Sequence, residues 1–117
     1  MADGLSRVLL IVEDDELVRI TTAEMLREEG FEVLEAETAA QADTLLASAS
    51  YLLVDRTLPD RDGLVLARAA RGLRPELAIV IASGRELVGN EFVSLLKPFT
   101  MAALLQALDR ARQAAGG

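Results

Sequence analysis

The sequence predicts a single α/β domain built on a doubly wound, five-stranded parallel sheet, and three observations support this prediction. Apolar segments rich in β-formers alternate with segments of helical periodicity, and the connections between them are short. Most of the strand segments are continuously apolar, as strands covered on both faces are. The chain has 117 residues, of which 51% are hydrophobic, which fits one domain with a real core. We expect that domain to occupy residues 1–117, with frayed ends at 1–6 and 115–117.

Five segments are expected to form the strands. Residues 8–12, 51–54 and 77–82 are apolar throughout and should lie in the centre of the sheet. Residues 31–35 (FEVLE) alternate apolar and charged side chains, as an edge strand does, and residues 92–96 supply the fifth strand. Because the alternating strand is the second, we expect the flavodoxin-like order 2-1-3-4-5 with right-handed crossovers. The absence of a GxGxxG motif after the first strand counts against NAD or FAD binding.

Helical periodicity marks four segments between and after the strands. The first covers residues 17–29 and ends at Gly30. Its apolar, buried face is expected to consist of Leu17, Ile20, Thr21 and Met25, with Val18 and Leu26 beside them. The second covers residues 38–47 and begins with a capping box, Thr38 to Gln41. The third and the last are expected over 64–71 and 100–114.

The composition excludes several kinds of site and partner. The chain has no cysteine and no histidine, which rules out disulfides, His- or Cys-ligated metals and Ser-His-Asp triads. Its net charge of −7 argues against direct nucleic-acid binding, because phosphate contacts need clustered Lys and Arg. The first residues lack a signal-peptide pattern, and no apolar run approaches the ~20 residues of a membrane span, so we expect a cytoplasmic protein.

Three carboxylates are expected to meet at one edge of the sheet. Glu13 and Asp14 directly follow the first strand, and Asp55 follows the neighbouring third strand. Two carboxylates ~4–5 Å apart repel each other by roughly 3–4 kcal/mol at an effective dielectric constant near 20. Either Asp14 or Asp55 should therefore have a raised pKa, and a divalent cation that prefers oxygen ligands, Mg²⁺ or Mn²⁺, would relieve the repulsion. The alternative for residues 13–16 is a solvated helix N-terminus.

Two more polar residues follow strands that end at the same edge. Ser83-Gly84 comes after the fourth strand and Lys97-Pro98 after the fifth. A hydroxyl and an ammonium group beside a metal-bound carboxylate make an anion site able to hold a phosphoryl group on Asp55. Each residue also has an ordinary interpretation, Ser83 as a turn residue and Lys97 as a surface charge. The Lys97-Pro98 bond is a candidate cis peptide that would fix the direction of the lysine.

Together these segments resemble the receiver domain of two-component response regulators. The matching motifs are VEDD at residues 12–15, DRTLPDRDG at 55–63, ASG at 82–84 and LKPF at 96–99, in the family's order and each at a strand end. The resemblance implies a phosphoryl-accepting signalling switch that is phosphorylated by a histidine kinase or a histidine phosphotransfer protein. It also implies a monomer or weak dimer, with no enzymatic activity beyond its own phosphorylation and autodephosphorylation.

The same resemblance implies a role for each residue of the site. Asp55 would be the phosphoacceptor, Lys97 would pair with the phosphoryl oxygens, and the Ser83 hydroxyl would move in to bond the phosphate. The ligands of Mg²⁺ would be the carboxylates of Asp14 and Asp55, the backbone carbonyl of Thr57 and, through water, Glu13.

The chain departs from the family between the fourth and fifth strands. Once residues 92–96 are assigned to a strand, only 84–91 (GRELVGNE) remain for a loop and a helix. A helix that short, with glycine at both 84 and 89, is marginal, so we expect the family's fourth helix to be missing or reduced to a turn. The family's aromatic switch position, three residues before Lys97, is occupied by Ser94. We therefore expect the output surface to differ from the usual one.

Other interpretations stay open on the sequence alone. A receiver-like adapter, whose partner reads one fixed conformation, is compatible with the shortened segment and with Ser94. A hydrolase of the haloacid-dehalogenase type also uses an Asp nucleophile with Mg²⁺, but that class needs a second Asp where Thr57 stands. Arg56 and Arg85 either contact the phosphoryl group or are solvated surface charges. The chain is either a stand-alone receiver or a piece of a larger protein such as a hybrid kinase.

Overall fold

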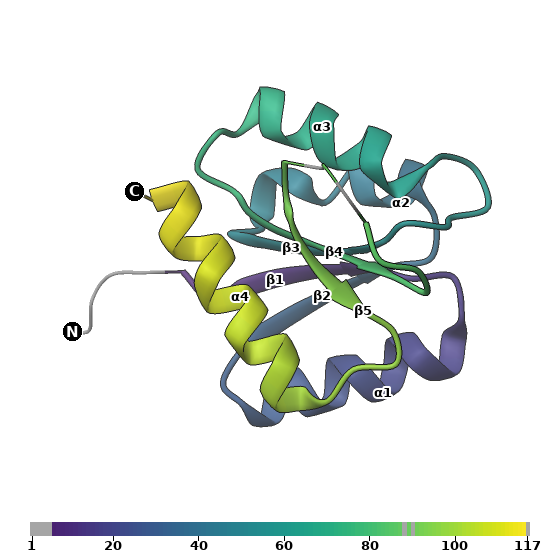
Figure 1. The fold of residues 1–117 in the computed structure, drawn as a ribbon, viewed down its shortest axis with the longest axis vertical. Helices are drawn as coiled ribbons and strands as arrows, with labels where there is room; N and C mark the ends of the chain where they lie inside the picture. Colours follow the sequence, from purple (N-terminus) through teal and green to yellow (C-terminus); the bar gives the residue numbers. More distant parts are fainter. Residues whose placement is uncertain (1–5, 88, 90, 117) are drawn as a thin grey trace.

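The computed structural model describes residues 6–87, 89 and 91–116 and contains a wholly parallel sheet in the order β2-β1-β3-β4-β5 (Figure 1). The strands are β1 (Val8–Val12), β2 (Glu32–Ala36), β3 (Tyr51–Asp55), β4 (Ala78–Ser83) and β5 (Val93–Leu96). The predicted sheet order is therefore confirmed. β2 lies at one edge, where its sequence EVLEA leaves Glu32 exposed and Glu35 partly exposed.

Helices cover both faces of the sheet, as the doubly wound prediction requires. They are α1 (Glu16–Glu28), α2 (Ala39–Asp43), α3 (Gly63–Leu73) and α4 (Met101–Gly116), with a 3-10 turn at Leu46–Ser48. In Figure 1, α2 and α3 lie on one face and α1 and α4 on the other. Of the ends expected to be frayed, residues 115 and 116 belong to α4, and residues 1–5 and 117 lie outside the described residues. Within the part of the chain that the structure describes, no helix combines the length and apolar character needed to cross a membrane.

The chain passes from β4 to β5 without a helix in the residues described there, 84–87, 89, 91 and 92. The prediction of a missing or reduced helix is confirmed for those residues. Two of the described residues of this connector, Glu91 and Phe92, contact α3. Arg68 donates to both carboxylate oxygens of Glu91, at 3.0 and 3.3 Å, and the Arg71 guanidinium lies 5.7 Å from the ring centroid of Phe92. The start of β5 is therefore held against α3 by side chains.

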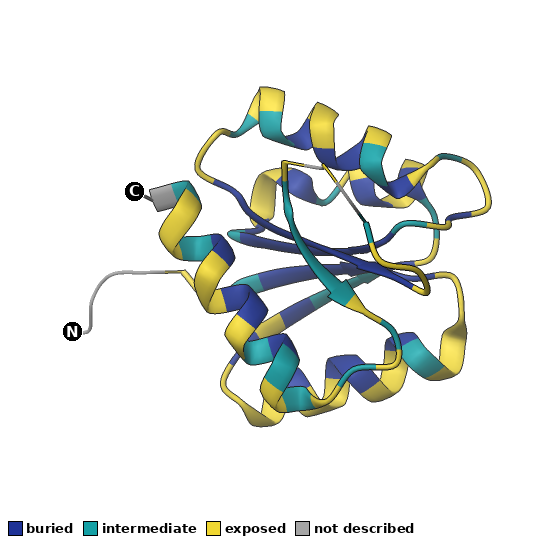
Figure 2. Cartoon of the chain, in the orientation of Figure 1, coloured by how far each residue is buried: buried dark blue, intermediate teal, exposed yellow. Residues whose placement is uncertain are grey.

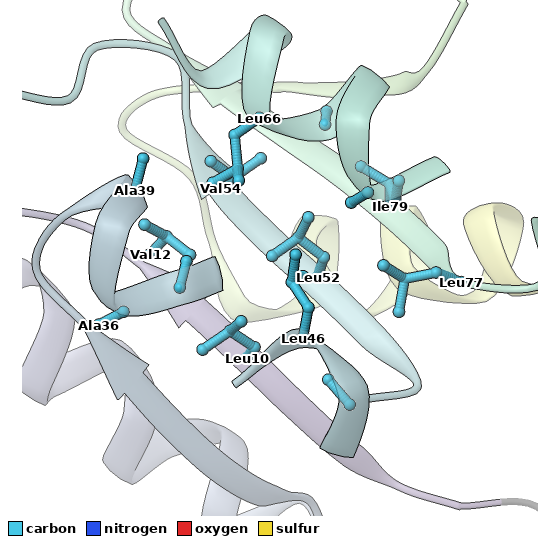
Figure 3. Close-up of a cluster of buried hydrophobic side chains, with 14 of the residues drawn as sticks. Leu10, Val12, Ala36, Ala39, Leu46, Leu52, Val54, Leu66, Leu77 and Ile79 are labelled. Atoms are coloured by element: carbon cyan, nitrogen blue, oxygen red, sulfur yellow. The ribbon is translucent and has the colours of Figure 1, made fainter. Parts of the chain in front are cut away.

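Two apolar clusters hold the helices to the sheet. Figure 2 shows β1, β3 and β4 buried along almost their whole length. The cluster under α2 and α3 contains Leu10, Val12, Leu52, Val54, Leu66 and Ile79 (Figure 3). The cluster under α1 and α4 contains Leu9, Ile11, Leu53, Val80, Leu104 and Leu108. Burying a side chain of this size contributes about 1.5–3 kcal/mol to the stability of the fold. The ends of the central strands are therefore held in place by a well-packed core.

The buried face of α1 differs from the predicted stripe. The four central residues of that stripe are all exposed, and Leu17 is 76% exposed, whereas Leu26 beside them is buried as expected. The buried face is formed instead by Arg19, Thr22, Ala23 and Leu26. Arg19 can be buried because its guanidinium donates hydrogen bonds to the Glu13 carbonyl at 3.1 Å and to the Glu35 carboxylate at 3.2 Å. The hydropathy pattern treats an arginine as a surface residue, and for that reason the prediction was wrong.

α2 is shorter than predicted. It begins as expected, with the Thr38 hydroxyl accepting the Gln41 N–H at 3.1 Å. The Gln41 side chain, however, accepts from the Glu37 N–H at 2.7 Å, one residue earlier than in a standard capping box. The helix ends at Asp43, and the 3-10 turn replaces the last turn of the predicted segment.

Candidate functional site

The polar residues that follow β1, β3, β4 and β5 stand at the C-terminal edge of the sheet. Asp55 is the last residue of β3 and is 9% exposed, at the end of a strand that is buried throughout. Gly63, the first residue of α3, lies directly behind it. A Cβ atom at Gly63 would be 2.2 Å from the Asp55 carbonyl oxygen and 2.8 Å from the Arg56 Cα. Only glycine allows this approach, which brings the start of α3 against the residue at the centre of the site.

Lys97 connects two of the carboxylates. Its Nζ donates hydrogen bonds to Asp55 Oδ2 and to Glu13 Oε1, each at 2.9 Å. Its own backbone N–H donates to the Ser83 carbonyl at 2.8 Å, and the Lys97-Pro98 peptide bond is cis, as expected. Lys97 is 42 residues from Asp55 and 84 from Glu13 in sequence, so this ion-pair network exists only in the folded chain.

Glu13, Asp14 and Asp55 form a cluster of carboxylates. One oxygen of each residue lies within 4.8 Å of those of the other two. Glu13 and Asp55 are buried and Asp14 is exposed, so solvent reaches the cluster at Asp14. The one ammonium group of Lys97 leaves an excess of negative charge on three carboxylates. An all-oxygen donor set with that excess fits a hard divalent cation such as Mg²⁺.

Burial changes the protonation equilibria of the cluster. It raises the pKa of the Glu13 carboxyl above its ordinary value, and Asp55 adds to the rise, while hydrogen bonds from Lys97 and the Asp15 amide oppose it. A raised pKa at Glu13 was not predicted from the sequence. Burial acts to lower the pKa of Lys97, but its hydrogen bonds to Asp55 and Glu13 outweigh burial and raise it, so the lysine stays charged.

Backbone N–H groups orient the two buried carboxylates. The Thr57 N–H donates to Asp55 Oδ1 at 3.0 Å, and the Asp15 N–H donates to Glu13 Oε2 at 3.1 Å. Thr57 was expected to act through its carbonyl, and the contact seen is made by its N–H. Arg19 was not among the predicted site residues, and its bond to the Glu13 carbonyl fixes the backbone where β1 ends. No periodicity marks this residue, because a helical arginine usually points to solvent.

Ser83 ends β4 and is 7% exposed. It directly follows Ala82, which is the register partner of Asp55 in the neighbouring strand. Its Oγ accepts the Arg85 N–H at 3.2 Å, so the hydroxyl hydrogen is available for another acceptor. Ser94 pairs with Ile81 in the sheet and lines a cavity of about 340 Å³ together with Ser83. The structure therefore places every sequence-predicted site residue at one end of the sheet.

The sequence is similar to those of known response regulators and sensor proteins. The model of the response regulator receiver domain matches residues 9–109. Transcriptional regulatory protein PdtaR of Mycobacterium tuberculosis is 35% identical over 118 aligned positions, which cover 92% of this chain and 58% of the relative. Sensor protein TorS of Escherichia coli is 41% identical over 81 positions, which cover 67% of this chain and 9% of that protein.

Solved structures share the fold over nearly the whole chain. A CheY-like response regulator receiver domain protein from Methanospirillum hungatei has a TM-score of 0.84 at 25% identity, covering 96% of this chain and 98% of that one. A sensor protein from a Polaromonas species has a TM-score of 0.81 at 31% identity, covering 92% and 97%. The chain spans 58% of the length of PdtaR and 53% of that of transcriptional regulatory protein PmrA of Pectobacterium parmentieri, to which it is 36% identical. With its sheet order and its family match over residues 9–109, the chain belongs to the response regulator receiver family.

Proposed function

We propose that this receiver domain is a signalling switch in which Asp55 accepts a phosphoryl group from a histidine kinase or a histidine phosphotransfer protein in the cytoplasm. One observation carries the proposal: the buried Asp55 carboxylate is held between Lys97 Nζ at 2.9 Å and the Thr57 N–H at 3.0 Å, beside two further carboxylates. Receiver domains are signalling modules rather than enzymes. The chemistry proposed here is limited to the domain's own phosphorylation and dephosphorylation.

In the proposed step, a carboxylate oxygen of Asp55 attacks the phosphorus of a phosphohistidine. The new P–O bond forms, the P–N bond breaks with its electron pair staying on the imidazole, and a proton from solvent completes the neutral ring. Lys97 pairs with the negative charge of the transferred phosphoryl oxygens. The Ser83 hydroxyl donates to one of these oxygens. Its Oγ accepts the Arg85 N–H through a lone pair, which leaves the hydroxyl hydrogen for the phosphoryl group.

Mg²⁺ or Mn²⁺ would be held by Asp14 and Asp55, by the Thr57 carbonyl and, through water, by Glu13. The support for this ligand set is the donor chemistry of the cluster, which offers oxygen atoms only and more negative charge than Lys97 balances. When bound, such a cation supplies positive charge beside the phosphoryl oxygens.

The test is labelling by acetyl phosphate, followed by intact mass. We expect wild type to gain one phosphoryl group in the presence of Mg²⁺ and none after chelation, and Asp55→Asn to gain none. Asp60→Asn is the matched control, because Asp60 is a carboxylate of the same loop that bonds to α2 instead. Equal labelling of Asp55→Asn and wild type would assign the phosphoryl group elsewhere. Failure of wild type with both acetyl phosphate and a cognate kinase would remove the proposal.

A second candidate, a phosphorylation-independent adapter, is favoured by Ser94 and by the connector, which has no helix in its described residues. The two candidates differ in how a bound partner responds to the phosphodonor. A partner that binds wild type and Asp55→Asn equally, with and without acetyl phosphate and Mg²⁺, would establish the adapter. A change in affinity that needs Asp55 would establish the switch.

A further inference from the structure

Arg19 holds the backbone on both sides of Asp14. Its guanidinium donates to the Glu13 carbonyl at 3.1 Å, and its backbone N–H donates to the Asp15 carbonyl at 2.9 Å. In the part of the chain that the structure describes, no hydrogen bond or ion pair reaches the exposed Asp14 carboxylate. The position of that carboxylate therefore depends on the backbone of its two neighbours.

Glu35 of β2 and Glu37, which follows that strand, keep Arg19 in place. Arg19 Nε lies 3.2 Å from Glu35 Oε1, and Arg19 Nη1 lies 3.7 Å from Glu37 Oε1. The arginine is 7% exposed, so these carboxylates and the Glu13 carbonyl take the place of solvent around its guanidinium. Glu35 is in turn bonded to Arg27 at 3.2 Å. The edge strand thus fixes Arg19, and Arg19 fixes the loop after β1.

The packing of α1 does not by itself require an arginine at position 19. A methionine would cover the same face without desolvating a charge, and replacing buried ion pairs by apolar side chains is often neutral or stabilising. A methionine could not donate to the Glu13 carbonyl, however. What the arginine adds is therefore a fixed backbone next to Asp14, one of the proposed ligands of the cation.

The charge of Arg19 by itself works against a bound cation. A positive group beside the carboxylate cluster repels a second one, so by Coulomb interaction alone its removal would strengthen cation binding. Positioning of Asp14 predicts the opposite, because a displaced carboxylate binds the ion less well. Since the two effects differ in sign, the affinity of the cation separates them.

We propose that Arg19 is a positioning residue for the divalent cation, because its two bonds hold Asp14 beside Asp55. The inference rests on the proposed cation site and adds to it a residue that acts through the backbone of its neighbours rather than by contact with the ion. Replacing a group that orients metal ligands commonly weakens the affinity for the metal by about 10–100-fold.

The experiment compares the Mn²⁺ affinity of Arg19→Met with that of wild type by calorimetric titration, at a temperature where both proteins are folded. We expect the Kd of Arg19→Met to rise about tenfold. Arg27→Met is the matched control, because it removes the same charge from the same helix and because Arg27 bonds to β2. Its Kd should not rise. An equal or lower Kd in Arg19→Met would leave only the effect of charge and would overturn the inference.

Arg19→Lys tests the same bond with the charge retained. An ammonium group can donate to the Glu13 carbonyl but lacks the planar fork that also reaches Glu35, so its Kd should lie between those of wild type and Arg19→Met. If Arg19→Met does not fold, an unchanged Kd in Arg19→Lys would overturn the inference.

Leu26→Ala separates positioning from stability. Leu26 is fully buried on the same face of α1, so this variant should lower the stability of the domain and leave the Kd of Mn²⁺ unchanged. A rise in Kd equal to that of Arg19→Met would show that any damage to α1 weakens the ion, and the inference would fall.

A second measurement needs no cation. Amide hydrogen exchange of the metal-free protein follows the Glu13 N–H, which donates to the Ala36 carbonyl at 3.0 Å, and the Asp15 N–H, which donates to Glu13 Oε2 at 3.1 Å. We expect Arg19→Met to speed exchange at these two amides about tenfold and to leave the amides of β3 unchanged. Equal acceleration in β3 would indicate a loss of global stability and would overturn the positioning role.

The outcomes separate this inference from the phosphoacceptor role. Labelling of Asp55 in wild type with an unchanged Mn²⁺ Kd in Arg19→Met would overturn the inference and leave the phosphoacceptor intact. If wild type is not labelled but Arg19→Met still weakens Mn²⁺ binding, the positioning role stands and the phosphoacceptor role falls. Absence of Mn²⁺ binding to wild type, or binding that Asp14→Asn does not weaken, would overturn the inference whatever the labelling shows.

Discussion

Among the described glycines, Gly63 is the one at which an added Cβ would make the closest contacts. Its Cα lies so close to β3 that a methyl group would overlap backbone atoms of Asp55 and Arg56. Its N–H also donates to the Arg56 carbonyl at 2.7 Å. Because backbone atoms cannot rotate away as a side chain can, the overlap has to be relieved by moving α3 or the end of β3.

We expect Gly63→Ala to lower the free energy of unfolding by about 1–3 kcal/mol or more and to slow labelling of Asp55. Gly72→Ala is the control, because nothing lies within 4 Å of a Cβ there and the position is inside α3. That variant should be stabilised by about 0.5–1 kcal/mol. Urea unfolding of both variants measures the difference. Equal stability of Gly63→Ala and wild type would show that the close approach is not a real constraint.

At the scale of single residues, the sequence predicted the site residues whose positions follow from where the strands end. Asp55, Ser83 and Lys97 could be placed together because parallel strands end at one edge of the sheet. Arg19 could not be found, since its burial depends on a carbonyl at the end of β1 and a carboxylate on β2. The raised pKa of Glu13 was missed for a related reason, because it follows from how deeply the folded chain buries that carboxyl.

At the scale of elements, the loop after β3 also supports α2. Asp60 accepts hydrogen bonds from the N–H groups of Ala39 and Ala40, at 2.9 and 3.0 Å, which are the first two residues of α2. These bonds lower the pKa of Asp60, with Ala39 contributing most. α2 has only five residues, so a partner for its first N–H groups matters to whether it forms. The loop that carries the site is thereby joined to a second helix.

The lowered pKa of Asp60 predicts a pH dependence of stability. The carboxylate contributes fully above its unfolded-state pKa, near 3.8, and the contribution is lost as pH falls through the lower folded-state pKa. We expect the stability advantage of wild type over Asp60→Asn to be constant near neutral pH and to shrink below about pH 4. Urea unfolding from pH 7 to pH 3 measures it, with Asp109→Asn as the control on α4. An advantage that grows on acidification would contradict the assignment.

The types and order of the helices and strands were predicted correctly, but their bounds and buried faces were predicted less well. The connector lacks a described helix because eight residues with two glycines cannot make a stable one, and this could be read from spacing alone. The buried face of α1 could not be predicted from the sequence, because the exposed residues Leu17 and Met25 fit an apolar stripe and the buried Arg19 does not. The cavity of about 490 Å³ beside Leu17 and Phe99 shows where that exposed stripe lies.

At the scale of the whole molecule, three of the 19 acidic side chains meet where β1 and β3 end. The net charge of −7 is spread over the chain, but Glu13, Asp14 and Asp55 place carboxylate oxygens within 4.8 Å of one another. Folding has to bring these groups together against their repulsion, which the ion pairs of Lys97 with Glu13 and Asp55 partly offset. A cation that binds the folded chain alone therefore stabilises the whole domain.

We expect Mg²⁺ to raise the melting temperature by several degrees, since a ligand at 100 times its Kd adds about 2.7 kcal/mol to the free energy of unfolding. Calorimetry with and without millimolar Mg²⁺ measures this shift. Asp14→Asn is the matched control, because Asp14 is exposed and its replacement should remove the shift without opening the core. A shift of equal size in Asp14→Asn would place the binding elsewhere.

β5 is reached through a connector with no helix in its described residues, and its own residues are only partly buried, whereas β4 is buried throughout. Local opening should therefore need less free energy at β5 than in the centre of the sheet, and β5 amides should exchange with deuterium sooner than those of β3. Lys97 directly follows β5, so an anion bound by Lys97 has to be released before that strand opens. Slower amide exchange in β5 would then report occupancy of the site from an edge of the molecule that the ligand does not touch.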